Sequence, residues 1–231
     1  MVASASSSLK FHVAHAVAPF GSAAVVNSRR SNVYLFLDFS NIAISASQLT
    51  SERGDGRFAR SKLRLHAENL RRFVERDRMW QRGFAAAGLL NQRSAIKDHF
   101  EQFGIEFEIC ERGQVTGREQ NVDQRIRMEM LELLDSEQPT GTIVLATGDG
   151  SGFQEKRGFI KTLSIRHQQG FSIEVMSWRH SLNGNLRDWA TEHGRVIELD
   201  DFYEELTFVP GQRSATDGHR LFGKLARRRV I

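Results

Sequence analysis

The fold class is decided by the stretch Val33-Tyr34-Leu35-Phe36-Leu37-Asp38-Phe39-Ser40-Asn41, in which a short apolar run ends at an aspartate. A second run of this kind is Thr142-Ile143-Val144-Leu145-Ala146-Thr147-Gly148-Asp149. Such runs are typical of strands that are buried on both faces of a parallel sheet. Ligands of parallel sheets bind outside the carboxyl ends of the strands. Asp38 and Asp149 are therefore predicted at a functional edge, where converging carboxylates commonly hold a divalent cation.

The rest of the chain alternates between strand-like and helix-like segments. The predicted strands are 33–38, 80–90, 105–110, 142–146, 171–176 and 195–199, and the predicted helices are 63–74, 96–103, 122–134, 159–167 and 182–191. A polar loop is expected after Asp38. This alternation predicts an α/β fold with a mostly parallel sheet of five or six strands and helices on both faces.

Composition places the chain among soluble intracellular proteins. Its 231 residues are 40% hydrophobic and 26% charged, which suits one α/β domain. No apolar run approaches the roughly 18–20 residues of a membrane span. The single cysteine, Cys110, excludes an intrachain disulfide and fits a reducing compartment. We therefore predict no membrane association and a cytoplasmic location.

The chain is predicted to have two extensions around one domain. Residues 1–31 are rich in serine and alanine and contain no acid, as in a disordered extension or an organellar targeting peptide. Residues 32–209 are predicted to form the domain. Residues 210–231, with six basic side chains against one acid, are predicted to be a basic C-terminal tail.

Charge is distributed unevenly along the domain. Residues 57–82 carry nine basic and three acidic side chains, whereas residues 38–209 as a whole have a net charge of −4. An acidic body with a basic segment suits a metal-dependent protein that binds nucleic acid, although a solvated surface is the simpler interpretation. The predicted nucleic-acid-binding residues are Arg60, Lys62, Arg64, Arg71 and Arg72.

Three aspartates are candidates for the site, and each has a purely structural alternative. Asp38 and Asn41 stand where strand one ends, but either could cap the following segment. Asp149 lies in a glycine-rich stretch where backbone can approach a ligand, but Asp-Gly is also an ordinary turn. Asp123 opens a predicted helix, where an acid is favourable against the helix dipole. Each signal is ambiguous when it is taken alone.

The ordered set of motifs resembles the NYN domains of the PIN-like ribonuclease superfamily, from Val33 to about Phe208. The matching stretches are 36–41, 118–123, 144–150, 170–175, 181–186 and 199–202. The resemblance implies a three-layer αβα fold. It also implies a carboxylate cluster that binds Mg²⁺ or Mn²⁺ and cleaves RNA phosphodiester bonds.

The resemblance assigns roles position by position. Asp38, Asp123 and Asp149 match the acidic positions of the family, Asn41 matches its asparagine after the first strand, and Glu119 matches a position that is often lysine or glutamate. One departure stands out. Many members have a second aspartate two residues after the one matched by Asp149, and here Ser151 stands there. Serine is a poorer ligand for a hard cation than a carboxylate.

The function predicted from the sequence is that of a metal-dependent ribonuclease acting on single-stranded RNA. Asp38, Asp123, Asp149 and Glu119 would hold the metal, while Asn41 and Ser151 would orient water or phosphate. The alternative is an NYN-fold module that binds RNA or protein and has weak or no catalytic activity. A phosphatase or nucleotide hydrolase using the same acidic edge is a further alternative, and a homo-oligomer or a protein partner stays open.

Overall fold

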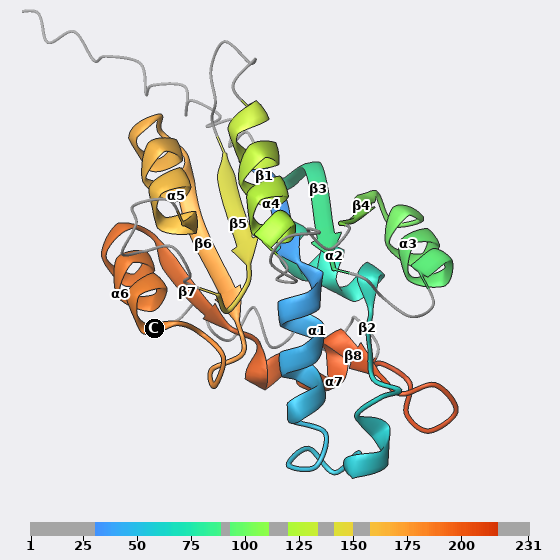
Figure 1. The fold of residues 1–231 in the computed structure, drawn as a ribbon. Coiled ribbons are helices and arrows are strands. Elements are labelled where there is room, and N and C mark those ends of the chain that lie inside the picture. Colours follow the sequence, from blue (N-terminus) through green and yellow to red (C-terminus); the bar gives the residue numbers. More distant parts are fainter. Residues whose placement is uncertain (1–30, 89–92, 111–119, 134–140, 150–157, 217–231) are drawn as a thin grey trace, which may run out of the picture.

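The computed structural model describes residues 31–88, 93–110, 120–133, 141–149 and 158–216. Its centre is a six-stranded sheet in the order β4-β3-β1-β5-β6-β7, and every neighbouring pair is parallel (Figure 1). The strands are β1 (Asn32–Asp38), β3 (Met79–Ala87), β4 (Ile105–Ile109), β5 (Thr142–Ala146), β6 (Ser172–Ser177) and β7 (Arg195–Glu198). The predicted parallel sheet is confirmed.

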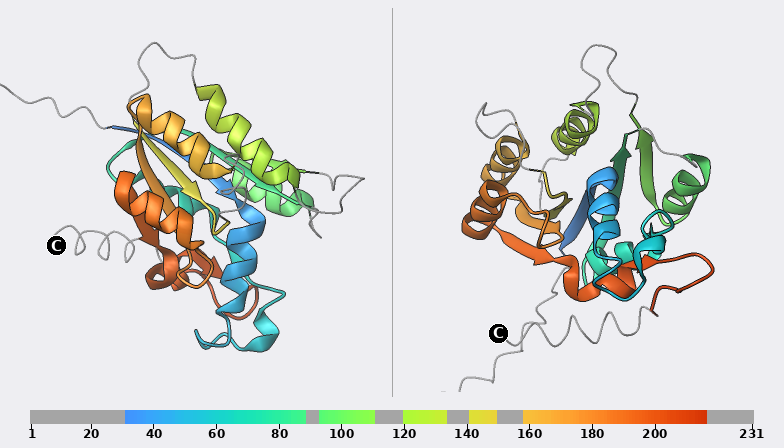
Figure 2. Two further views of the ribbon diagram at one scale, coloured as in Figure 1. Left: turned by 60° about the vertical axis from the view of Figure 1, so that its left-hand side comes forward. Right: turned by 60° about the horizontal axis from the view of Figure 1, so that its bottom comes forward.

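Helices cover both faces of this sheet and complete a three-layer α/β fold (Figure 2). One face carries α1 (Phe39–Gln48), α2 (Ala67–Glu75), α3 (Arg93–Glu101) and α7 (Tyr203–Leu206), and the other carries α4 (Gln120–Glu132), α5 (Phe159–Gln168) and α6 (Gly184–His193). Strand β1 supplies both cores, because successive side chains of a strand point to opposite faces. Leu35 and Leu37 pack on the α1 face and Phe36 packs on the α4 face.

The order of the strands creates a topological switch point between β1 and β5. The chain builds β1, β3 and β4 in one direction, and then returns to the other side of β1 to build β5, β6 and β7. Residues Leu37 and Ala146 are paired at the carboxyl ends of the two central strands. In open α/β sheets the binding crevice lies at such a point. Asp38 and the 147–149 stretch both leave the sheet here.

Two predicted elements are corrected by the structure. The segment after Asp38 is the helix α1 rather than a polar loop, and its buried Phe39, Ile42 and Ala46 share one face. Its serines and isoleucines are weak helix formers, so packing rather than propensity decides this helix. The helix predicted from Leu63 begins only at Ala67, because residues Arg64–Leu65 form strand β2.

Strand β2 belongs to a second, small sheet that the sequence did not predict. It pairs antiparallel with β8 (Thr207–Phe208), so the chain before α2 and the chain after α7 lie side by side. Strands of two residues carry too little periodicity to be recognised in a sequence.

A buried ion-pair network also connects early and late parts of the chain. Asp55 accepts hydrogen bonds from Arg213 Nε (2.7 Å), Arg213 Nη2 (2.9 Å) and Tyr203 Oη (2.8 Å). Arg213 falls in the segment predicted as a basic tail, and the structure packs this residue against the domain. The network therefore ties the segment after α1 to the C-terminal part of the described chain.

Candidate functional site

Asp38 serves as both a helix cap and the centre of the candidate site. It is the last residue of β1 and the N-cap of α1, and its Oδ1 accepts a hydrogen bond from the Asn41 backbone N–H (3.0 Å). Its Oδ2 accepts one from the Thr147 hydroxyl (3.3 Å). The carboxyl is only 5% exposed. Both of these hydrogen-bond donors are neutral, so neither compensates the charge of an ionised Asp38.

The electrostatics of Asp38 link the three predicted aspartates. Burial raises the pKa of Asp38 to about 7, against a usual 3.8, and the hydrogen bond from Asn41 opposes the rise. The negative charges of Asp123 and Asp149 raise this pKa further, and the Thr147 hydroxyl lowers it. Asp123 lies in the first turn of α4 and Asp149 lies three residues after the end of β5. Acidic residues from three elements therefore share one electrostatic environment at the switch point.

Asn41 joins the two central strands through its side chain. Its Oδ1 accepts a hydrogen bond from the Gly148 N–H (2.7 Å), so the start of α1 is fixed to the end of β5. Gly148 is required here for close approach. A Cβ at this residue would lie 2.5 Å from the Ser181 carbonyl oxygen and 2.9 Å from Asn41 Oδ1. The glycine-rich stretch is thus part of a packed junction as well as a turn.

Replacing Gly148 with alanine is expected to lower the free energy of unfolding by about 1–3 kcal/mol, because the new methyl group overpacks against the Ser181 backbone. Urea unfolding followed by tryptophan fluorescence measures this. The matched control is Gly184→Ala, where a Cβ meets nothing within 4 Å. Equal effects of the two substitutions would contradict the close-approach explanation.

Thr147 is a site residue that the sequence did not single out. Its side chain is fully buried, it donates to Asp38 Oδ2, and it accepts a hydrogen bond from the Asp149 N–H (3.1 Å). It therefore orients the Asp38 carboxyl and holds the backbone of Asp149. The signal was present in the sequence, because Thr147 is the first hydroxyl after the apolar run 143–146. Ser40 has a different role, since its Oγ accepts a hydrogen bond from the Gly88 N–H (2.9 Å) at the end of β3.

The donor set suits a hard cation, although it does not form a closed metal cage. Carboxylate and amide oxygens are the ligands that Mg²⁺ and Mn²⁺ take. Within the part of the chain that the structure describes, no group of three or more His, Cys, Asp or Glu is arranged to hold a metal ion. Glu119 and Ser151, two further residues of the predicted site, lie outside the described residues.

The five predicted nucleic-acid-binding residues fall into two groups. Arg71 and Arg72 lie on α2 and pair with carboxylates of the same helix, Glu75 (3.5 Å) and Glu68 (2.6 Å). The other three precede α2. Arg64 Nη1 donates to the carbonyl oxygens of Ser61 (3.0 Å) and Leu63 (2.9 Å).

Arg60 and Lys62 are exposed and form no ion pair with any residue in the described ranges. They follow the short 3-10 helix Arg57–Ala59. The available positive charge is therefore concentrated before β2 rather than on α2.

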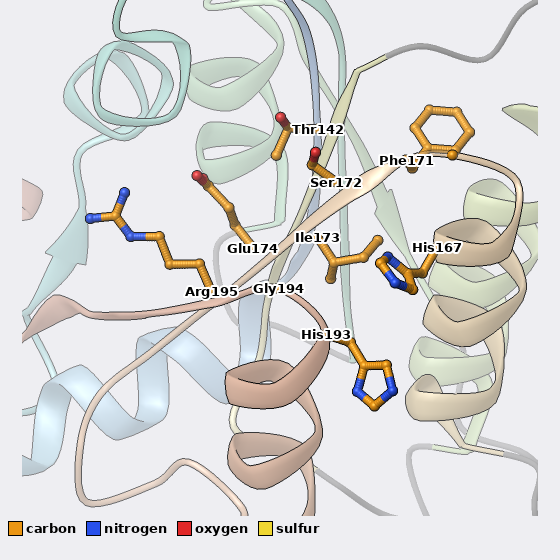
Figure 3. Close-up of a pocket in the computed structure, with 10 residues that line it drawn as sticks. Thr142, His167, Phe171, Ser172, Ile173, Glu174, His193, Gly194 and Arg195 are labelled. Atoms are coloured by element: carbon orange, nitrogen blue, oxygen red, sulfur yellow. The ribbon is translucent and has the colours of Figure 1, made fainter.

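A separate cavity of about 500 Å³ lies at the amino ends of the strands, whereas the candidate site lies at their carboxyl ends (Figure 3). Thr142, Ser172 and Arg195, which begin β5, β6 and β7, line it together with His167 and His193. Figure 3 shows the two histidines on neighbouring helices beside these strand ends. This cavity is at the amino ends of the strands, away from the three aspartates.

Among the described residues, none of the helices is long and apolar enough to cross a membrane.

Comparison with curated proteins gives no match. A crystal structure of a protein of unknown function from Vibrio parahaemolyticus is similar, with a TM-score of 0.49 and 13% identity over 75% of this chain and 96% of that one. The NYN domain family model matches residues 32–195, which is most of the chain and spans the main sheet from β1 to the start of β7. The chain therefore belongs to the NYN domain family.

Proposed function

We propose that this protein is a metal-dependent ribonuclease that hydrolyses RNA phosphodiester bonds at the switch point between β1 and β5. One observation carries the proposal: a buried carboxyl at a strand end, Asp38, has its pKa raised to about 7 by burial and by two further aspartates. Strongly perturbed carboxyls in a crevice are typical of functional sites. Membership of the NYN domain family supports the same chemistry.

Asp38, Asp123 and Asp149 would hold Mg²⁺ or Mn²⁺, partly through water, because the described carboxylates do not by themselves enclose an ion. The ion would supply an activated water and stabilise the leaving oxygen. The protein's own part is positioning. Thr147 fixes the orientation of Asp38, and Asn41, whose Oδ1 is held by Gly148, keeps an amide NH₂ that can donate to a phosphate oxygen.

The direct test is cleavage of end-labelled single-stranded RNA by the purified protein with Mg²⁺, with Mn²⁺ and with EDTA. We expect cleavage with either metal and none with EDTA. Asp149→Asn and Asp123→Asn are each expected to lower the rate at least about tenfold, because each removes one charge from the cation site.

The matched control is Asp98→Asn, an exposed aspartate on α3, which is expected to leave the rate unchanged. Cleavage that persists in EDTA, or that Asp149→Asn does not slow, would reject the proposed site. RNA binding without cleavage would favour the alternative, a binding module of the same fold. Turnover of a small phosphate ester while RNA stays intact would favour a phosphatase.

The binding module is the second candidate because the described donors do not converge on one point. The serine at position 151 supports it as well, since it stands where many family members have a carboxylate. In that case Asp123 and Asp149 would raise the pKa of Asp38 without the three aspartates binding a metal, and neither Mg²⁺ nor Mn²⁺ would change the melting temperature.

A further inference from the structure

An aromatic side chain is exposed at the start of the basic segment 57–82. Phe58, in the 3-10 helix Arg57–Ala59, is 79% exposed. Four large hydrophobic residues are exposed in the described part of the chain, and Phe58 is the most exposed of them. A single exposed apolar side chain is common on protein surfaces. Its surroundings therefore decide whether it has a function.

Three cations that form no ion pair in the described part of the chain lie close to Phe58 in the sequence. The Arg57 guanidinium lies over the Phe58 ring, 5.0 Å from its centroid. Arg60 and Lys62, two and four residues after Phe58, are exposed, and among the described residues none of these three cations forms an ion pair. We call Arg57, Phe58, Arg60 and Lys62 the Phe58 surface. The one acid between residues 53 and 66 is Asp55, which is buried against Arg213.

Buried side chains and hydrogen bonds hold the segment that carries the Phe58 surface in place. Ala59 and Leu63 are buried in the core, and the Gly56 N–H donates to the Thr50 carbonyl oxygen (3.1 Å). Asp55 fixes the same segment to Arg213 and Tyr203. A side chain presented on an ordered backbone loses less entropy on binding than one on a flexible loop. Phe58 is thus held outward while its neighbours pack inward.

A helix without charged side chains lies between the Phe58 surface and the candidate site. Helix α1, about 15 Å long, joins the two regions and carries no charged side chain. Asn41, Ile44 and Gln48 have the i, i+3, i+7 spacing of one helix face, and Ile44 is 54% exposed. Figure 1 shows α1 running away from the carboxyl ends of β1 and β5, with the 49–62 segment beyond its far end. A strand bound along α1 would meet no acidic side chain of this helix.

We propose that Phe58 is a base-stacking residue and that single-stranded RNA runs from the Phe58 surface along α1 to Asn41. The charge pattern favours this occupant, because cations around an aromatic face fit a phosphate backbone with an unstacked base. The proposal deepens the proposed ribonuclease function and rests on it for the direction of the strand. Neither Phe58 nor Arg57 belongs to the five basic residues predicted from the sequence.

The test is the affinity of the full chain for a fluorescein-labelled oligouridylate of about 15 nucleotides, measured by anisotropy in EDTA so that no cleavage occurs. Phe58→Ala is expected to weaken binding about tenfold, the effect of losing one stacked base. Phe58→Trp should bind as tightly as the natural protein. Phe58→Leu should be as weak as the alanine variant, because leucine keeps apolar area but lacks a ring face.

A salt titration separates stacking from charge. Arg57→Gln is expected to reduce the slope of log affinity against log salt by about 0.7, whereas Phe58→Ala leaves this slope unchanged. The matched control is Met128→Ala, an exposed apolar residue on α4, which should not affect affinity. Unchanged affinity in Phe58→Ala, or equal affinity of the tryptophan and leucine variants, would overturn the proposal. Self-association that Phe58→Ala abolishes, with RNA affinity unchanged, would overturn it in favour of a protein interface.

The two proposals fail separately. If Phe58→Ala weakens RNA binding but the natural protein does not cleave RNA in Mn²⁺, the Phe58 surface stands and the ribonuclease proposal falls. If the natural protein cleaves RNA and Phe58→Ala changes neither affinity nor cleavage at low RNA concentration, the ribonuclease proposal stands and the Phe58 surface falls.

Discussion

Asp38→Asn is expected to lower metal-dependent RNA cleavage about 1,000-fold and, at the same time, to make the protein more stable at pH 8. The loss of activity follows because Asp38 is the most buried of the three aspartates and links the other two electrostatically. Several kcal/mol of transition-state stabilisation by a metal corresponds to a factor of this size. Asparagine keeps the oxygen that accepts from the Asn41 N–H, so α1 keeps its cap.

The size of the gain in stability depends on pH. In the unfolded chain the Asp38 carboxyl ionises near pH 3.8, whereas in the folded protein it stays protonated up to about pH 7. Ionisation therefore destabilises the folded natural protein progressively as the pH rises from about 4 to about 7. The asparagine variant has no such charge. Its advantage should be absent near pH 4 and should reach about 2–4 kcal/mol at pH 8.

Thermal unfolding at both pH values, with and without Mn²⁺, measures this effect independently of activity. Mn²⁺ should raise the melting temperature of the natural protein at pH 8, because a ligand that binds only the folded state stabilises it. The increase in melting temperature caused by Mn²⁺ should be much smaller for Asp38→Asn. Asp98→Asn serves as the control for a lost surface charge. A variant that is less stable than the natural protein at pH 8 would contradict the raised pKa.

Arg213→Ala is the substitution expected to destabilise the protein most, by about 3 kcal/mol. It leaves the buried carboxylate of Asp55 without the guanidinium that donates to both of its oxygens. Among the described residues, the Tyr203 hydroxyl is then the one remaining donor to this carboxylate, at 2.8 Å. Because Asp55 anchors the segment of the Phe58 surface, the variant should also bind RNA more weakly. Urea unfolding gives the first effect and the anisotropy assay gives the second.

The pH dependence of the destabilisation by Arg213→Ala should identify the Asp55 carboxylate as its cause. The hydrogen bonds from Arg213 hold the pKa of Asp55 below its usual 3.8, so their stabilising effect is present above about pH 4 and disappears as the pH falls through the lowered pKa. The difference between Arg213→Ala and the natural protein should therefore shrink in acid. Lys161→Ala removes an exposed cation of α5 and is the control, with a change within about 0.5 kcal/mol. A difference that is independent of pH would assign the loss to packing.

Much of the fold was readable from the sequence because the two central strands, β1 and β5, are built on short apolar runs. The strand 142–146 was predicted with the bounds that the structure has, since glycine and threonine mark its ends and nothing polar interrupts it. Helix α1 was missed for the opposite reason. Its stretch Phe39–Gln48 has few strong helix formers, and the Asp38 cap and the packing of Ile42 against the sheet make it helical.

The candidate site, like the fold, could be predicted only in part from the sequence. The sequence alone identified Asp38 and Asp149 as strand-end carboxylates, because burial on both faces of a parallel sheet leaves a pattern that can be read locally. Only the tertiary structure decided that β5 returns beside β1, which places the two aspartates at one switch point and brings the charge of Asp123 to them. The roles of Thr147 and Gly148 depend on contacts more than 100 residues apart, with Asp38 and Asn41. No local sequence pattern encodes these long-range contacts, because they form only when the strands pair.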